Sequence, residues 1–117
     1  MQLQLYGEKI WVLKQPVDFR RSIDGLSSLI INKFGINPNN GLFIFYNKNK
    51  DKIKCLTWHK NGFLLLYKRL ELGKFKFLTK QDDQTQDISM KEFGWLLAGL
   101  EWQHMSQWQE LDYDKFD

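Results

Sequence analysis

The sequence predicts an α+β fold, in which a single domain holds an antiparallel sheet of four to five strands and two main helices in the order β-α-β-β-β-β-α. Two stretches carry apolar residues near the period of a helix. Between them, the chain changes to short apolar runs separated by turn-forming residues, which is typical of strands. Its 117 residues, 43% of them hydrophobic, suffice for one packed core. We expect residues 1–105 to form this domain and residues 106–117 to form an acidic, aromatic C-terminal tail.

The first strand and the first helix are expected in the N-terminal third of the chain. The run KIWVL, residues 9–13, is rich in β-branched and aromatic side chains, and Pro16 favours a break after it. One face of the helix that follows carries Phe19, Ile23, Leu26, Ile30 and Phe34. Asp18 is the expected N-cap, because its carboxylate can accept a hydrogen bond from a free backbone N–H, and Gly35 is the expected C-terminal stop.

A meander of strands is expected after the loop INPNNG. LFIFY, residues 42–46, is apolar at consecutive positions, as in a strand covered on both faces. IKCLTW (53–58) and FLLLYKRL (63–70) flank the Asn-Gly pair at 61–62, which predicts a tight hairpin with positive φ angles at this pair. KFKFL (74–78) ends the meander, and its strict alternation places its phenylalanines on one face and its lysines on the other.

The second helix is expected to begin after Ser89. Ser89 and Glu92 have the spacing of a capping box, in which each side chain bonds to the backbone N–H of the other residue. Ile88 and Phe93 have the spacing of a hydrophobic staple, which packs together across the start of a helix. The residues expected to face inward are Phe93, Leu96, Leu97 and Leu100.

Charge is divided unevenly along the chain. The net charge is +3, yet residues 1–80 hold 15 Lys and Arg against 5 Asp and Glu, whereas residues 81–117 hold 2 against 9. A basic body of this kind attracts phosphate backbones, and an acidic tail could compete with them or dock on a partner. The alternative is a solvated surface on which the charges are segregated by chance.

Nine cations form the candidate surface for nucleic acid. They lie at the start of the first helix, around the polar turn near residue 50, and at the end of the meander. They are Arg20, Arg21, Lys48, Lys50, Lys52, Lys68, Arg69, Lys74 and Lys76. In the alternative interpretation, the hairpin cations only cover apolar surface with their stems, and the two arginines form ion pairs with Asp18 or Asp24 at helical spacing.

The sequence carries no pattern that predicts catalysis, a metal site or a cofactor. A restriction-type nuclease needs Asp or Glu two residues before a Lys, and no Lys has this neighbour. Cys55 and His59 are four residues apart in a predicted strand, about 13 Å, which is too far to share a zinc ion. With one cysteine, no signal-peptide pattern and no long apolar run, we expect a non-enzymatic cytoplasmic protein that makes no membrane contact.

Five motifs follow one another along the chain: DFRRSIDGL, GLFIFYNK, IKCLTWHKNGF, LYKRLELGKFKF and ISMKEFGWLLAGLEW. In order and spacing they resemble the TnpB accessory protein of the insertion-sequence-sixty-six family, over about nine tenths of the chain. The matching residues are Asp18, Arg20, Arg21, Asp24, Gly25 and Leu26, and then Lys68, Arg69, Leu70, Glu71 and Gly73. The chain departs from the family at His59, where an acidic residue is usual, and at Phe77-Leu78, where Trp-Pro is usual.

The resemblance implies a small accessory factor that supports transposition beside a separate, larger transposase and has no established activity of its own. We expect this factor to bind DNA through the nine cations and to bind the transposase of the same element through apolar or acidic surface. The main alternative is a protein-interaction adaptor that never contacts DNA. An unrecognised nuclease is the third and least favoured hypothesis.

Overall fold

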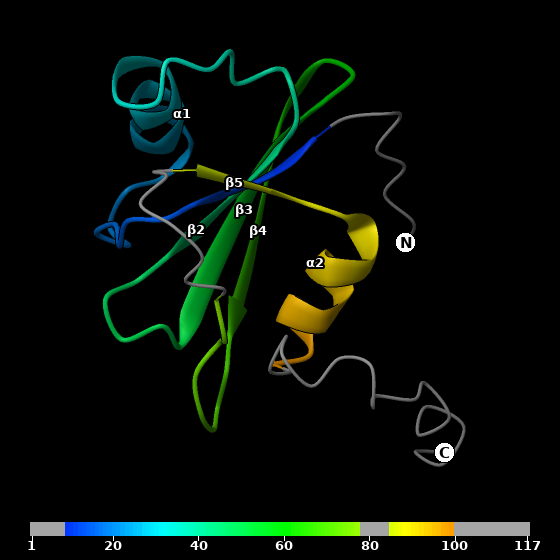
Figure 1. The fold of residues 1–117 in the computed structure, drawn as a ribbon. Coiled ribbons are helices and arrows are strands. Elements are labelled where there is room, and N and C mark those ends of the chain that lie inside the picture. Colours follow the sequence, from blue (N-terminus) through cyan, green and yellow to red (C-terminus); the bar gives the residue numbers. More distant parts are fainter. Residues whose placement is uncertain (1–8, 78–84, 100–117) are drawn as a thin grey trace.

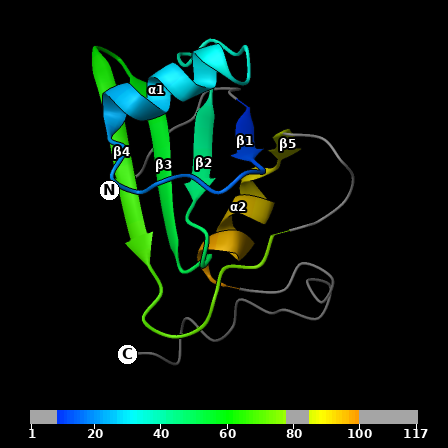
Figure 2. The ribbon, with the colours of Figure 1, turned by 90° about the vertical axis from the view of Figure 1, so that its left-hand side faces the viewer.

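A computed structural model describes residues 9–77 and 85–99 of the chain as one five-stranded sheet with a helix on each face (Figures 1 and 2). The elements are β1 (Ile10–Leu13), α1 (Ile23–Asn32), β2 (Leu42–Tyr46), β3 (Lys52–His59), β4 (Gly62–Arg69), β5 (Thr85–Ile88) and α2 (Met90–Leu97). The strands lie in the order β4-β3-β2-β1-β5. The predicted α+β class and element order are therefore confirmed.

The sheet is mixed rather than wholly antiparallel as predicted. β2, β3 and β4 form the expected antiparallel meander, and β5 also pairs antiparallel with β1. β1 and β2, however, run parallel, with Ile10 opposite Leu42 and Val12 opposite Ile44. The reason is α1, because a helix between two neighbouring strands returns the chain to the same end of the sheet and makes the strands parallel.

Each face of the sheet has its own apolar cluster. The α1 face buries Leu13, Leu26, Ile30, Phe43, Phe45 and Leu56. The opposite face, against α2, buries residues of β1, β2 and β3 together with Phe75, Ile88, Phe93 and Leu96. β2 is buried along its whole length, because it contributes alternate side chains to the two clusters. The helical face predicted for α1 and the helix–sheet packing of α2 are both confirmed for these residues.

The fifth strand lies later in the sequence than predicted. Residues 74–77 of the predicted strand 74–78 are not in a strand, and the sheet is completed by β5 instead. The predicted alternation still holds without a strand, because Phe75 is buried and the Phe77 ring lies 4.3 Å from that of Tyr46, while Lys76 is exposed. Phe75 and Phe77 pack into the apolar cluster between the sheet and α2. The segment therefore lies against this face of the sheet and does not pair along an edge.

The two helix N-termini differ in how well they follow the prediction. Ser89 begins α2 with both bonds of the capping box, 2.9 and 3.0 Å long, and Ile88 and Phe93 share one cluster, as predicted. Ser22, not Asp18, is the N-cap of α1 and makes no side-chain cap bond. The Asp18 carboxylate instead accepts bonds from Arg20, which holds residues 18–21 in a turn ahead of the helix.

The hairpin between β3 and β4 turns one residue earlier than predicted. The register places His59 opposite Gly62, which makes Lys60 and Asn61 the two turn residues. Lys60 has the positive φ, 55°, that was expected at the Asn-Gly pair.

At the C-terminal end of α1, Gly35 has a φ of 66°, and its N–H donates a hydrogen bond to the Ile31 carbonyl, which confirms the predicted stop.

Gly41 directly precedes β2, the strand that pairs in parallel with β1 and antiparallel with β3. Its φ is 146°, and a Cβ built on it would lie 2.5 Å from the backbone oxygen of Lys9. That oxygen also accepts the Leu42 N–H at 2.9 Å, and the Gly41 carbonyl accepts the Thr57 hydroxyl at 3.3 Å. Three strands therefore meet at a point where the backbone leaves no room for a side chain.

Some predictions fall on residues that the structure does not describe. Leu100 and the tail at 106–117 lie outside the described ranges, so their predicted roles stay predictions. Neither helix within 9–77 and 85–99 has the length and apolar character that crossing a bilayer requires.

Candidate nucleic-acid interface

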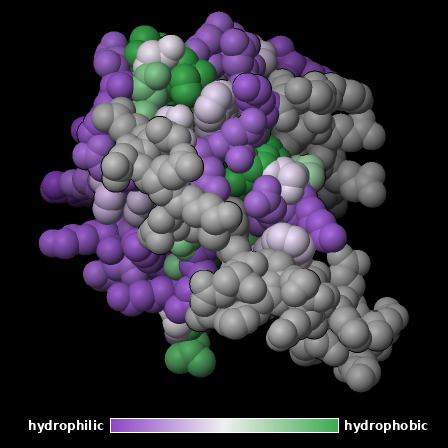
Figure 3. Space-filling view, in the orientation of Figure 1, coloured by the Kyte–Doolittle hydropathy of each residue, from purple (hydrophilic) through white to green (hydrophobic). Residues whose placement is uncertain are grey.

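Five of the nine predicted cations gather at one end of the sheet, which we call the basic end. It consists of Lys48, Lys50, Lys52, Lys74 and Lys76. They come from the turn between β2 and β3, the start of β3, and the segment after β4. Hydrophilic side chains cover the side of the molecule on which this turn lies (Figure 3). Within the described part of the chain, no side chain forms a hydrogen bond or ion pair with the ammonium group of any of the five.

Backbone hydrogen bonds bring these segments together. The Phe75 N–H donates to the Lys50 carbonyl at 2.7 Å, and the Leu70 N–H donates to the Asp51 carbonyl at 2.8 Å. Phe75 is buried beneath this contact and anchors the lysines on either side of it in sequence. A hydrogen bond from Asn47 lowers the pKa of Asp51, and the charges of Lys52 and Lys74 lower it further. Asp51 is therefore a carboxylate set among lysines.

Lys68 and Arg69 have structural partners at the end of β4. The Lys68 ammonium donates to the carbonyl of Leu97 at 2.5 Å, where α2 ends with free carbonyl groups. Arg69 forms two bonds to the Glu71 carboxylate, at 2.7 and 3.1 Å. The predicted pair thus divides, because Lys68 ties the sheet to α2, whereas Arg69 stays exposed in an ion pair beside the basic end.

Arg20 and Arg21 lie on the α1 face, in the turn ahead of α1. The Val17 N–H ties this segment to the Tyr46 carbonyl at the end of β2, at 2.9 Å. Arg20 forms a forked bond to the Asp18 carboxylate, with its shortest distance at 2.6 Å. Asp18 is a partner that the alternative interpretation named, but the pair spans two residues in a turn and does not have the predicted helical spacing. Arg21 turns toward α1, and its guanidinium lies 3.5 Å from the Gly25 carbonyl. The structure therefore places these two arginines on the α1 face beside Lys54, and not in the three segments that form the basic end.

The Asp18–Arg20 pair should make the stability of the fold depend on pH in the acidic range. Bonds from the Arg20 side chain and then from its backbone N–H lower the pKa of Asp18 to about 2. Carbon-detected NMR titration should therefore find the Asp18 midpoint near 2, and Arg20→Gln should move it back toward 3.8. Because the pKa is lower in the folded state, the pair stabilises the fold above pH 3.8 and loses this effect as the pH falls through about 2. A wild-type midpoint at 3.8 would show that the pair does not form in solution.

Lys54 is the residue that the sequence interpretation missed. Only 8% of it is exposed, although its neighbours among the lysines reach solvent. Its ammonium donates to the carbonyls of Phe19 and Arg21, both at 2.7 Å, and lies 5.0 Å from the Phe19 ring. Desolvation lowers the pKa of Lys54, while the nearby charge of Asp18 acts in the opposite direction. Lys54 thus fixes the turn at 18–21, which carries the motif arginines, to β3.

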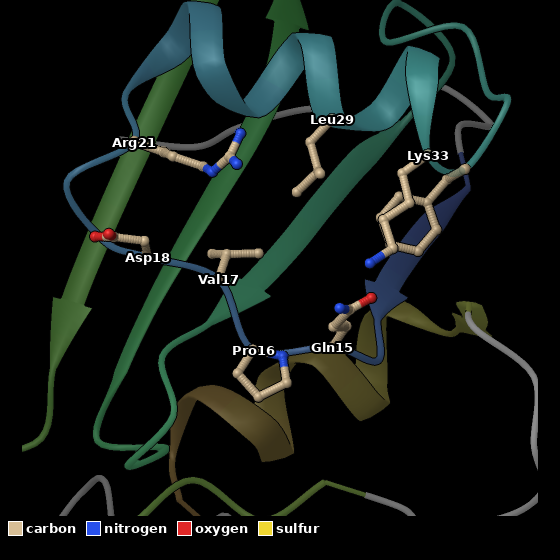
Figure 4. A pocket seen from close by; sticks show the side chains of 8 residues that line it. Gln15, Pro16, Val17, Asp18, Arg21, Leu29 and Lys33 are labelled. Atoms are coloured by element: carbon tan, nitrogen blue, oxygen red, sulfur yellow. The ribbon is translucent and has the colours of Figure 1, made fainter.

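A pocket of about 160 Å³ lies between the segment before this turn and α1 (Figure 4). Val17, Leu29 and Phe34 give it apolar walls. Arg21 and Lys33 reach it from opposite ends of the helix, while the carboxylate of Asp18 points away. Its volume is below the roughly 300–1,000 Å³ of sites that enclose small molecules, which makes it a weaker candidate than the charged surfaces.

The described residues hold no cluster of metal ligands, and their cysteine is buried. Within 9–77 and 85–99, no three His, Cys, Asp or Glu side chains come close enough to hold a metal ion. Cys55 is buried, and this burial raises the pKa of its thiol to about 12, so the thiolate needed for nucleophilic chemistry is scarce. At the basic end, the described residues offer positive charge with one exposed ring, Tyr67, beside it.

Similar proteins agree with the resemblance in the motifs. The model of the family described as IS66 Orf2 like protein matches residues 8–107. Two proteins of Sinorhizobium fredii (strain NBRC 101917 / NGR234) are also similar over 97 residues. Uncharacterized protein y4jC is 40% identical, with 82% of each chain covered, and uncharacterized protein y4hO is 26% identical, with 82% of this chain and 84% of that protein covered. No solved structure matches the chain.

Proposed function

The chain belongs to the family of IS66 Orf2-like proteins, a transposition-associated family of accessory proteins without known catalytic activity, and we propose that it binds DNA through the basic end. The observation that carries this proposal is the meeting of five lysines from three segments, with their ammonium groups unbonded within the described part of the chain. The Asp51 carboxylate offsets only part of this charge, and keeping the remaining like charges together costs free energy unless a further anion binds there. A phosphate backbone supplies such anions at regular spacing.

The second part of the proposal is a protein partner. An accessory protein of transposition that binds DNA can act only where the transposase acts, so we propose that it also binds the transposase of the same element. We also propose a cytoplasmic location, because the DNA and the transposase would both be met there. Co-purification with that transposase, with and without DNA carrying the ends of the element, tests this part independently of DNA binding.

Charge removal at the basic end tests the DNA-binding part. The wild-type protein should bind duplex DNA with little sequence preference, and contact with about four to six phosphates gives a slope of log affinity against log salt near −4 to −5. Replacing Lys48, Lys74 and Lys76 with Gln should weaken binding at low salt and make the slope shallower by about 2–3. Melting temperature should stay near that of the wild type, because these side chains make no bond within the described part of the chain.

A matched control removes the same number of charges elsewhere. Lys33, Lys60 and Lys91 are exposed and lie outside the basic end, so their replacement with Gln should leave the slope nearly unchanged. An equal loss in both triple variants would mean that only net charge matters, which contradicts a defined basic end. If the wild-type protein binds no DNA at low salt but retains the transposase, the protein is an adaptor and the DNA-binding proposal is wrong.

A further inference from the structure

Tyr67 is an exposed aromatic ring beside the basic end. It lies on the α1 face of β4, where Phe63 and Leu65, at alternate positions before it, pack into the α1 cluster. Tyr67 lies beyond the part of β4 that packs into this cluster, and 53% of the residue is exposed. Among the described residues it is the one aromatic side chain with so large an exposed fraction. An apolar ring that remains exposed in this position has a free face to offer to a ligand.

The ring is held in place by groups that are themselves fixed. The Phe19 ring meets it edge-on, with the centroids 6.1 Å apart and an interplanar angle of 63°. The ammonium of Lys54 lies 6.0 Å from its centroid and is anchored by two carbonyl groups. A ligand that stacks on Tyr67 therefore loses little free energy in ordering the ring, because packing has already restricted it.

Cations surround the ring on the same face. Arg69 follows it by two positions on β4, and Lys52 lies opposite Arg69 on β3. Arg20 adjoins Phe19 in the turn at 18–21. The ion pairs of Arg69 and Arg20 are exposed, with side-chain exposures of 56% and 92%, and pairs of this kind contribute little to stability. A phosphate could therefore replace either carboxylate at small cost.

We infer that this face of β3 and β4 binds a single DNA strand, with one unpaired base stacked on Tyr67 and the neighbouring phosphates on Lys52, Arg69 and Arg20. This inference rests on the proposed DNA binding and specifies its substrate. Bases within a duplex hide their faces in the stack, whereas an unpaired base can stack on an aromatic side chain. Tyr67 and Arg69 are two residues apart on β4, which is about 6.6 Å. Successive nucleotides in a duplex are only about 3.4 Å apart along the axis, so this spacing suits an extended single strand of DNA.

The test compares a short oligothymidylate with a duplex as labelled probes in anisotropy titrations. Tyr67→Leu keeps an apolar side chain but removes the ring, and should weaken binding of the single strand by roughly 5- to 150-fold. Duplex affinity should change less than about twofold, since phosphate contacts carry it. Tyr67→Phe keeps the ring and should bind both probes as the wild type does, while the unchanged duplex affinity of Tyr67→Leu shows that this variant is still folded.

Ile31 provides the matched control, because it is exposed to a similar extent, 52%, but lies on α1. Ile31→Ala should leave both affinities unchanged. Equal losses of single-strand and duplex affinity in Tyr67→Leu, or no loss of either, would overturn the stacking inference while leaving DNA binding itself in place. If the wild-type protein binds neither probe at low salt, the proposed function fails as well, so the two failures can be told apart.

Discussion

Gly41→Ala is expected to destabilise the protein by about 2–4 kcal/mol, the largest effect that we predict for a single methyl group here. The added Cβ would lie 2.5 Å from the backbone oxygen of Lys9, and a backbone atom cannot move aside as a flexible side chain can. The φ of 146° is also one that only glycine adopts easily. Urea unfolding followed by circular dichroism gives the change in the free energy of unfolding.

Gly94→Ala is the control for this substitution. Gly94 lies within α2, and a Cβ there would meet no atom within 4 Å. Because alanine is the better helix former, this variant should gain about 0.5–1 kcal/mol. Similar stabilities for the two variants would show that the close approach of Gly41 to β1 does not exist in solution.

Lys54→Met should lower the free energy of unfolding by about 1–3 kcal/mol, because it leaves the carbonyls of Phe19 and Arg21 without their donor. Methionine has a similar length and can occupy the same apolar space between Phe19 and Tyr67. The substitution also removes the free-energy cost of burying the Lys54 charge. This gain offsets part of the stability that is lost with the two hydrogen bonds. Chemical unfolding measures the change in the free energy of unfolding. Exchange of the backbone amide hydrogens of residues 18–22 with solvent should become faster if the turn is released.

Lys52→Met is the matched control, two residues earlier on β3 and on the same face of the sheet. No side chain in the described ranges bonds to the Lys52 ammonium, so we expect a change within about 0.5 kcal/mol. If Lys54→Met is as stable as the wild type, water satisfies the two carbonyls. In that case Lys54 does not position the turn that carries Arg20 and Arg21.

The elements with strong local signals could be predicted from the sequence. The apolar faces of both helices, the continuous apolar run of β2 and the capping box at Ser89 all depend on neighbours within a few residues. β5 carries no such signal, because Thr85–Ile88 is a polar edge strand with one buried side chain, Ile88. Its place is decided by pairing with β1, which lies at the other end of the chain.

The candidate site could be predicted in composition but not in arrangement. Seven of the nine cations lie in or next to the segments that meet at one end of the sheet, whereas Arg20 and Arg21 come from the turn ahead of α1. Lys54 was overlooked because a charged residue in a strand normally faces solvent. One signal pointed to it: in the alternation of β3, Lys54 shares a face with the buried Leu56.

The position of β1 between β2 and β5 has a consequence for synthesis of the chain. The strands of the meander can pair through short loops as soon as they leave the ribosome. β1 pairs with β2 only after α1 has been made, and with Thr85–Ile88 only after the whole meander has been made. Until then Ile10 and Val12, both buried in the finished sheet, lie along an edge without its last strand. The nascent protein therefore passes through a stage that can aggregate, and this stage ends only when β5 arrives.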